Sequence, residues 1–160
     1  MPEAVPPILT FTCRLRVDIG KAMDLGLRAQ GQRRFMPITG GTVEGPYLNG
    51  RILAGGGDWQ TVRSDGVVEL HAQYAIELID GTPVEIEDRG FRHFDSEAVN
   101  LSPANGSMSS TGYYFQTSAR LNAAAGSYEW LSRTVFVASA ERHAKQVVID
   151  LFALGNFRCA

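Results

Sequence analysis

Apolar and polar residues alternate along much of this chain with a period of two, which is typical of half-buried antiparallel β-strands. From Leu9 to Asp18, apolar residues and Cys13 occupy every second position, with Thr, Arg and Asp between them. The same pattern predicts a strand over residues 68–78. One face of that strand carries Val68, Leu70, Ala72, Tyr74, Ile76 and Leu78. Further strands are predicted over residues 34–44, 51–54, 58–63, 84–88, 113–121, 128–139 and 147–154.

Two Asp-Gly pairs, Asp65-Gly66 and Asp80-Gly81, separate three of these strands and predict consecutive hairpins. The region from Phe91 to Gly112 is expected to be a long connection, of the kind that often carries function. About eight strands joined by hairpins predict a single all-β domain over residues 1–160. We expect a small antiparallel barrel, lipocalin-like or allene-oxide-cyclase-like, with a two-sheet sandwich as the alternative. Glycines at 40–41 and 55–57 favour the barrel, because closing a sheet needs sharp bends.

The first hairpin allows two registers, and they point different side chains into the barrel. With a two-residue loop, Ser64 faces Val67, and both Trp59 and Arg63 share the apolar face with Tyr74. With a three-residue loop and a bulge, Arg63 faces Val67, and Asp58 shares the face with Tyr74. Because a one-residue slip turns every side chain to the other face, the sequence leaves both registers open.

Composition and charge narrow the function classes. Hydrophobic residues make up 44% of the chain, charged residues 20%, and the formal net charge is −2. This charge argues against nucleic-acid binding, because such domains carry a basic patch. No apolar run approaches the roughly 20 residues of a membrane helix, and residues 1–7 do not resemble a signal peptide. With two cysteines that lack metal-type spacing, we expect a reduced, cytoplasmic location and no membrane partner.

The motifs of common enzyme classes are absent from the sequence. There is no Gly-x-Ser-x-Gly elbow, no phosphate-binding loop and no His-Glu-x-x-His. The histidines His71, His93 and His143 lack ligand spacing, so neither a metal nor an organic cofactor is expected. Any chemistry would therefore have to come from the side chains of the barrel itself.

The segment around Asp58 supplies the candidate site. An acid between three glycines and an indole is placed where desolvation can raise its pKa, which suits a general acid or base. A turn-capping Asp58 with Trp59 in the core is the structural alternative. The candidate catalytic residues are Asp58 as acid/base, Arg63 as the group that stabilises an anion, and Tyr74 as hydrogen-bond donor. The candidate ligand contacts are Gly57, Trp59, Glu44, Tyr114 and Trp130.

An ordered set of short motifs spans the chain from about residue 8 to 154. It consists of Gly45-Pro46, Gly50, Gly55-Gly56, Asp58-Trp59, Arg63, Asp65-Gly66, Tyr74, Asp80-Gly81 and Tyr128-x-Trp130-Leu131. In this set the chain resembles the domain of unknown function 3237 family, also called uncharacterised protein family 0311. The resemblance implies a compact β-barrel and cytosolic bacterial or fungal members, and it brings no settled activity. The chain departs from the family pattern at Gln116, at Leu121-Asn122-Ala123 and at Ser132.

Three functions follow as hypotheses. The first is a cofactor-independent isomerase, cyclase or lyase that moves a proton on a small, partly apolar metabolite. The second is a non-catalytic carrier of such a ligand, and the third is a module that forms homo-oligomers. A raised Asp58 pKa inside a cavity would favour catalysis. A wholly apolar cavity would favour the carrier, and Trp59 in a subunit contact would favour the module.

Overall fold

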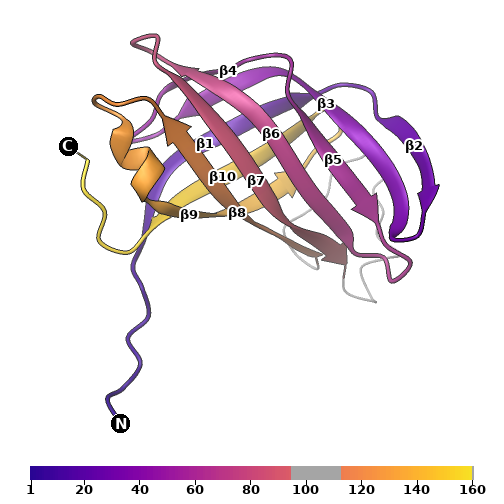
Figure 1. The fold of residues 1–160 in the computed structure, drawn as a ribbon, viewed down its shortest axis with the longest axis horizontal. Helices are drawn as coiled ribbons and strands as arrows, with labels where there is room; N and C mark the ends of the chain where they lie inside the picture. The colour runs from indigo at the N-terminus through magenta and orange to yellow at the C-terminus, as the bar shows by residue number, and fades with distance from the viewer. Residues whose placement is uncertain (95–112, 160) are drawn as a thin grey trace.

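The computed structural model of the protein describes residues 1–94 and 113–159. Within these residues the chain forms ten β-strands and one short 3-10 helix, η2 (Glu129–Arg133). The strands are β1 (Leu9–Ile19), β2 (Met23–Arg28), β3 (Gly31–Glu44), β4 (Gly50–Ile52), β5 (Gly57–Val62), β6 (Val68–Leu78), β7 (Pro83–Phe94), β8 (Tyr113–Ala123), β9 (Val135–Arg142) and β10 (Gln146–Leu154). Figure 1 shows them wrapped into a barrel, with η2 at the left end and β2 at the right end.

The sheet closes on itself, which confirms the predicted barrel and makes the sandwich alternative wrong. The strand order β1-β10-β9-β8-β7-β6-β4-β3 is completed by antiparallel pairing of β3 with β1. Because β4 and β5 occupy one position between β3 and β6, the closed barrel has eight strand positions. A glycine permits the closure, since a Cβ on Gly41 would lie 2.0 Å from the Arg16 carbonyl oxygen of β1.

The hairpin at Asp65-Gly66 adopts the bulged register. The Arg63 N–H donates to the Val67 carbonyl at 2.9 Å, and Asp58 stands opposite Ala72. Gly66 takes a φ of +88°, which a glycine accepts without steric cost. Of the two registers that the sequence left open, the one that puts Asp58 on the interior face is therefore correct.

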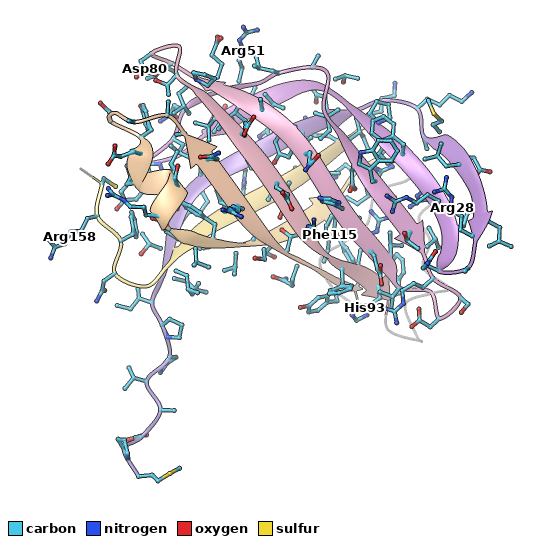
Figure 2. The ribbon with its side chains drawn as sticks, in the orientation of Figure 1. Arg28, Arg51, Asp80, His93, Phe115 and Arg158 are labelled. Atoms are coloured by element: carbon cyan, nitrogen blue, oxygen red, sulfur yellow. The ribbon has the colours of Figure 1, made fainter. Side chains whose placement is uncertain are left out.

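The barrel interior divides into two halves of different chemistry. The half nearest η2 is apolar, and we call it the apolar half. It includes Cys13, Val43, Ile76, Val84, Leu121, Phe136 and Leu151, all essentially without solvent exposure. The other half, which we call the polar half, holds Arg34, Asp58, Gln60, Asp88, Arg92, Thr117 and Arg142. Figure 2 marks the two ends, with Asp80 and Arg158 at the η2 end and Phe115 and His93 toward the other.

Several parts of the chain depart from the predicted strands, and β2 is a strand where none was predicted. Residues 129–133 form η2 instead of the start of a strand over residues 128–139, so the late strand begins only at Val135. β7 continues to Phe94, and the rest of the connection predicted from Phe91 to Gly112 lies outside the described residues up to Tyr113. A register shift between Phe11 and Cys13 turns the Phe11 ring to the outside, where it packs edge-on against Phe152.

Other expectations concern the cysteines and the membrane. Cys13 is buried and Cys159 is exposed, and both thiols are free. In the part of the chain that the structure describes, no helix has the length and hydropathy needed to cross a bilayer.

Candidate functional site

A cavity occupies the polar half of the barrel. It has about 50 Å³ of space open to the centre of a water molecule. That is room for roughly three to five water-sized groups. Its polar lining consists of Asp58, Gln60, Tyr74, Asp88, Arg92, Thr117 and Arg142. Its apolar lining consists of Val17, Ile19, Met36, Ile38, Leu70, Ala72, Phe115, Val147 and Ile149. The cavity thus joins apolar walls to a convergent set of polar groups, as small-molecule sites do.

Two aspartates enter this cavity from either side of a small residue. Asp58 of β5 is paired in register with Ala72 of β6, and Ala72 is paired with Asp88 of β7. Residues paired across neighbouring strands point to the same face of a sheet, so both carboxyl groups face inward. Because Ala72 has only a methyl group, the space between the two carboxyl groups stays open.

Asp58 is held by hydrogen bonds to both of its oxygens. The His71 backbone N–H donates to Oδ1 at 2.9 Å, and Nε2 of Gln60 donates to Oδ2 at 2.7 Å. Nε of Arg34 donates to Oε1 of Gln60 at 2.6 Å, which fixes the Gln60 amide. Burial raises the pKa of Asp58, while these hydrogen bonds and the charges of Arg92 and Arg34 partly offset the rise. Asp58 is therefore a fixed acceptor inside the barrel.

Asp88 is less restrained than Asp58. It is only 5% exposed, and its Oδ1 has no hydrogen-bond donor among the described residues. Burial raises the pKa of Asp88 to about 7, and the charge of Asp58 adds to the rise, against a lowering by the hydroxyl of Thr117. That hydroxyl lies near enough to influence Asp88 but forms no hydrogen bond of normal geometry. Near neutral pH, Asp88 can therefore both release and accept a proton.

Tyr74 stands two residues beyond Ala72 on the same face of β6. Its hydroxyl is buried and finds no hydrogen-bond partner in the described part of the chain. Burial raises the pKa of Tyr74 well above its usual value, and the charges of Asp88, Cys13 and Asp58 act in the same direction. The phenol therefore stays protonated and has a hydrogen bond to donate.

Three arginines complete the polar half. Arg92 of β7 is 6% exposed, lies with its guanidinium carbon 5.5 Å from the Phe115 ring centroid, and leaves Nε without a described acceptor. Burial lowers the pKa of Arg92 to about 10, with repulsion from Arg34 and Arg142 as further causes and Asp58 opposing them. Burial likewise lowers the pKa values of Arg34 and Arg142. All three remain positively charged near neutral pH.

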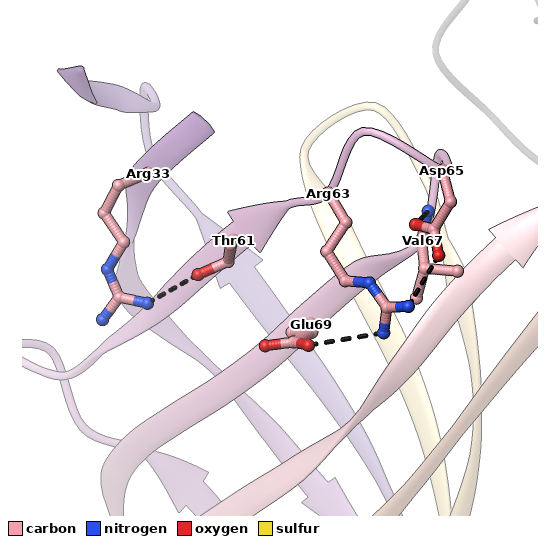
Figure 3. A network of polar contacts seen from close by, with 6 residues as sticks. All are labelled: Arg33, Thr61, Arg63, Asp65, Val67 and Glu69. Atoms are coloured by element: carbon pink, nitrogen blue, oxygen red, sulfur yellow. Dashed lines mark hydrogen bonds and ion pairs between the residues drawn. The ribbon is translucent and has the colours of Figure 1, made fainter. Parts of the chain in front are cut away.

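Of the residues predicted for catalysis, the structure brings Asp58 and Tyr74 together and leaves Arg63 outside. Arg63 pairs on the exterior with Asp65 at 2.6 Å and with Glu69 at 3.4 Å (Figure 3). The bulged register explains this placement, because it turns Asp58 inward and Arg63 outward. The place expected for Arg63 beside Tyr74 is therefore wrong, and Arg92 supplies the interior cation instead.

The predicted ligand contacts also lie away from the cavity. Trp59 is 39% exposed on the outer face, with its ring centroid 4.5 Å from that of Phe35. Gly57 is buried beneath that same Phe35 ring, which lies where a Cβ would be. Trp130 is buried in η2, where it packs against Phe136 and Phe157 at the apolar end. Its predicted position on a strand was wrong.

The remaining two contacts are exposed. Glu44 ends β3, and Tyr114 stacks on His93 outside the barrel with ring centroids 4.9 Å apart. The positions at which the chain departs from the family pattern do not line the cavity either. Nε2 of Gln116 donates a hydrogen bond to Oγ of Ser139 on the exterior. Oγ of Ser132 accepts a hydrogen bond from the backbone N–H of Ala123 at the end of β8.

Sequence reasoning missed Asp88, Gln60, Arg34, Arg92 and Arg142. The signal for Asp88 and Arg92 was the alternation Val84, Ile86, Asp88, which continues through Gly90 to Arg92 when β7 is allowed its full length. Arg142 likewise continues the inward series of β9. No group of three or more His, Cys, Asp or Glu side chains suited to a metal occurs within residues 1–94 and 113–159.

Comparison with known proteins places the chain among uncharacterised barrels. Residues 7–154 match the family described as protein of unknown function (DUF3237). A UPF0311 protein of Bradyrhizobium diazoefficiens is 37% identical over 144 residues, which are 90% of this chain and 91% of that protein.

Solved structures agree with this assignment. A conserved protein of unknown function from Rhodopseudomonas palustris superposes with a TM-score of 0.86 at 32% identity, over 96% of this chain and 99% of the other. A beta-barrel like protein from Acinetobacter baumannii gives a TM-score of 0.84 at 34% identity, with the same coverage. An enzyme from Penicillium herquei gives 0.73 at 16% identity, over 96% of this chain and 98% of the other, and at that identity the likeness shows the fold alone.

Proposed function

The chain belongs to the DUF3237 family of proteins of unknown function, and from its interior site we propose that it is a cofactor-independent acid/base enzyme. It would move a proton on a small, partly apolar carbonyl metabolite, as in an isomerase, cyclase or lyase reaction. One observation carries the proposal: Asp58 and Asp88 flank Ala72 in the cavity, beside a buried Tyr74 hydroxyl that has no hydrogen-bond partner among the described residues.

Asp58 and Asp88 have different roles in this proposal. Both oxygens of Asp58 already accept hydrogen bonds, which favours its charged form. Asp88 has one oxygen without a donor among residues 1–94 and 113–159 and a pKa of about 7, so it is the better proton carrier. Because the two carboxyl groups influence each other, they would titrate as a pair, with apparent pKa values that belong to both. We therefore assign the proton transfer to Asp88 and the fixed charge to Asp58, where the sequence had suggested Asp58 alone.

The proton-transfer step balances without any further reactant. A carbon–hydrogen bond next to the carbonyl breaks, its proton goes to Oδ1 of Asp88, and its electron pair moves onto the carbonyl oxygen as an enolate. The Tyr74 hydroxyl donates a hydrogen bond to that oxygen, which stabilises the developing charge. Return of the proton to the same or another carbon completes an exchange or an isomerisation.

The polar content of the cavity favours this function over the alternatives. A carrier of an apolar ligand has no use for two buried acids and a buried arginine, since each such group costs free energy to bury. An oligomerisation module would need no interior site at all. The carrier and the module remain as outcomes of the experiment.

Hydrogen–deuterium exchange tests the proposal even while the natural substrate is unidentified. A panel of small carbonyl compounds, neutral and carboxylate-bearing, is incubated with the protein in D₂O, and loss of α-proton signals is followed by NMR. We expect enzyme-dependent exchange for some members and at least a hundredfold loss in Asp88→Asn, since general acid–base catalysis contributes about 10²–10⁴-fold. Asp65→Asn is the matched control, because Asp65 lies in an exposed turn.

Two results would count against the enzyme. One is the absence of exchange for every compound that binds, which would favour the carrier. The other is equal exchange by wild type and Asp88→Asn, which would show that the acid takes no part.

A further inference from the structure

We propose that the polar half of the barrel binds the carboxylate group of a monoanionic substrate through Arg92, flanked by Arg34 and Arg142. This inference rests on the proposed function, because it names the substrate class of the same cavity. It adds a binding role for arginines that the proton-transfer step does not use.

The first argument is the balance of charge. Arg92 brings a buried positive charge, half-buried Arg34 and Arg142 bring two more, and Asp58 and Asp88 supply at most two negative ones. Arg34 donates its hydrogen bond to the neutral amide of Gln60, and this contact does not offset the excess positive charge. With both carboxyl groups ionised, one unit of negative charge from a ligand would bring the cluster to neutrality.

The second argument is the state of Arg92. Its side chain is 94% buried, and Nε faces no acceptor among the described residues. Leaving a buried donor without an acceptor is costly, and the cost is greater when the donor is charged. A carboxylate fits this need, because its two oxygens can accept two parallel N–H bonds from one guanidinium.

The third argument is the size and lining of the cavity. About 50 Å³ of open space accepts a group of a few atoms, which suits a carboxylate and its attached carbon. Apolar side chains stand beside the arginines, and they include Ile19, Met36, Phe115 and Val147. The substrate would therefore be a carboxylate whose carboxyl end fills this space and whose remaining carbons extend along these side chains toward the open side of the cavity. With both carboxyl groups ionised, a dianion such as a phosphate ester would exceed this single surplus charge.

A purely structural role for Arg92 makes a different prediction. If Arg92 served to hold Asp58 and Asp88 together, its replacement by methionine would destabilise the fold. If it is kept for a ligand, Arg92→Met removes a buried charge and leaves the fold as stable or more stable, as happens when apolar residues replace buried ions.

Binding of hexanoate, with hexanamide as its neutral isostere, tests the site by calorimetry at pH 7. We expect wild type to bind hexanoate at least about tenfold more tightly than hexanamide, since a charge-assisted bond is worth about 1.5–3 kcal/mol. Arg92→Met should lose this preference, and Arg92→Lys should keep part of it. Arg89→Met is the matched control on the same strand, because Arg89 lies outside and pairs with Glu87.

Each outcome decides the inference. Equal affinity for the two ligands, no binding of hexanoate up to 10 mM (about 10⁴-fold weaker than a micromolar ligand), or a preference retained in Arg92→Met would overturn it. Loss of binding together with a lowered melting temperature in Arg92→Met would also overturn it, unless the well-folded Arg92→Lys shows the partial preference. Hexanoate binding needs no proton transfer. If it depends on Arg92 while no carbonyl compound exchanges, the anion site stands and the proposed function fails.

Discussion

The two halves of the barrel interior are lined by the same strands but differ in the kind of side chain that they bury. Along β7, Val84 and Ile86 lie in the apolar half, and Asp88 and Arg92 lie in the polar half of the same inward-facing series. In both halves burial favours neutral groups, since it raises the pKa of Cys13 to about 12 and that of Asp88 to about 7. A neutral thiol is inert in the apolar half, whereas an aspartate poised near neutrality is reactive. The comparison supports the proposal that the apolar half stabilises the fold and the polar half holds the site.

The largest effect is expected in the apolar half. Phe136 has no solvent exposure and contacts Trp130, with ring centroids 6.3 Å apart. Phe136→Ala should lower the free energy of unfolding by about 3–5 kcal/mol, because it removes buried area and leaves a cavity. Urea denaturation measures this change. The control is Val135→Ala on the same strand, which is 58% exposed and should change the free energy by less than about 0.5 kcal/mol.

A smaller effect of opposite sign is expected in the polar half from Asp88→Asn. The unfolded carboxyl has a pKa of 3.8 and the folded one about 7, so between these values only the folded protein holds the proton. Raising the pH across this window therefore lowers the free energy of unfolding of wild type. Asp88→Asn lacks this loss, and at pH 8 it should be more stable than wild type by about 1–3 kcal/mol.

This difference should shrink towards zero as the pH falls to 4, which chemical denaturation at several pH values measures. Asp65→Asn serves as the control, because its exposed carboxyl has a lowered pKa and should show the opposite trend. A difference between wild type and Asp88→Asn that does not vary with pH would contradict the burial account of Asp88.

In the polar half, Ala72→Val should impair ligand binding and exchange with little effect on stability, in contrast to Phe136→Ala in the apolar half. The added methyl groups enter the cavity between Asp58 and Asp88. We expect the free energy of unfolding to change by less than about 1.5 kcal/mol, since space is available, and hexanoate binding and carbonyl exchange to fall about tenfold or more. Unchanged binding and exchange in the folded variant would mean that the ligand does not occupy this space.

The smallest effect belongs to Arg63, on the outside. Its ion pairs with Asp65 and Glu69 are exposed, and such pairs contribute about 0–1 kcal/mol. Arg63→Ala should therefore leave exchange activity unchanged and alter the melting temperature only slightly. An exchange rate reduced by tenfold or more would return Arg63 to the site that the sequence had suggested.

Much of the barrel could be predicted because alternation and turn residues act locally. The inward series of β6 and both Asp-Gly turns followed from neighbouring residues alone. The hairpin register could not be decided, because either loop length keeps the apolar face of β6 inside and only the partner face of β5 changes. The alternation of residues 128–139 was misleading, since η2 buries Trp130 against Phe157, which lies far along the chain.

The site was harder to predict because its residues meet only when the barrel closes. Asp58 stood out by its neighbours, but Asp88, Arg92 and Arg142 look like ordinary polar ends of strands. They are brought to the interior only because the strands close into a barrel. The pairing of β3 with β1 makes that closure. Charged residues at strand ends on the inward series are therefore worth testing as interior groups in closed barrels.

The most direct test of the central claim is an NMR titration of the aspartate side-chain carboxyl carbons in the wild-type protein. The account predicts that the Asp58–Asp88 pair shows an apparent pKa near 7, while exposed Asp65 and Asp80 titrate below their usual value. If Asp58 and Asp88 both titrate near 4 with the other aspartates, the polar half holds no proton-exchanging acid and the claim is contradicted.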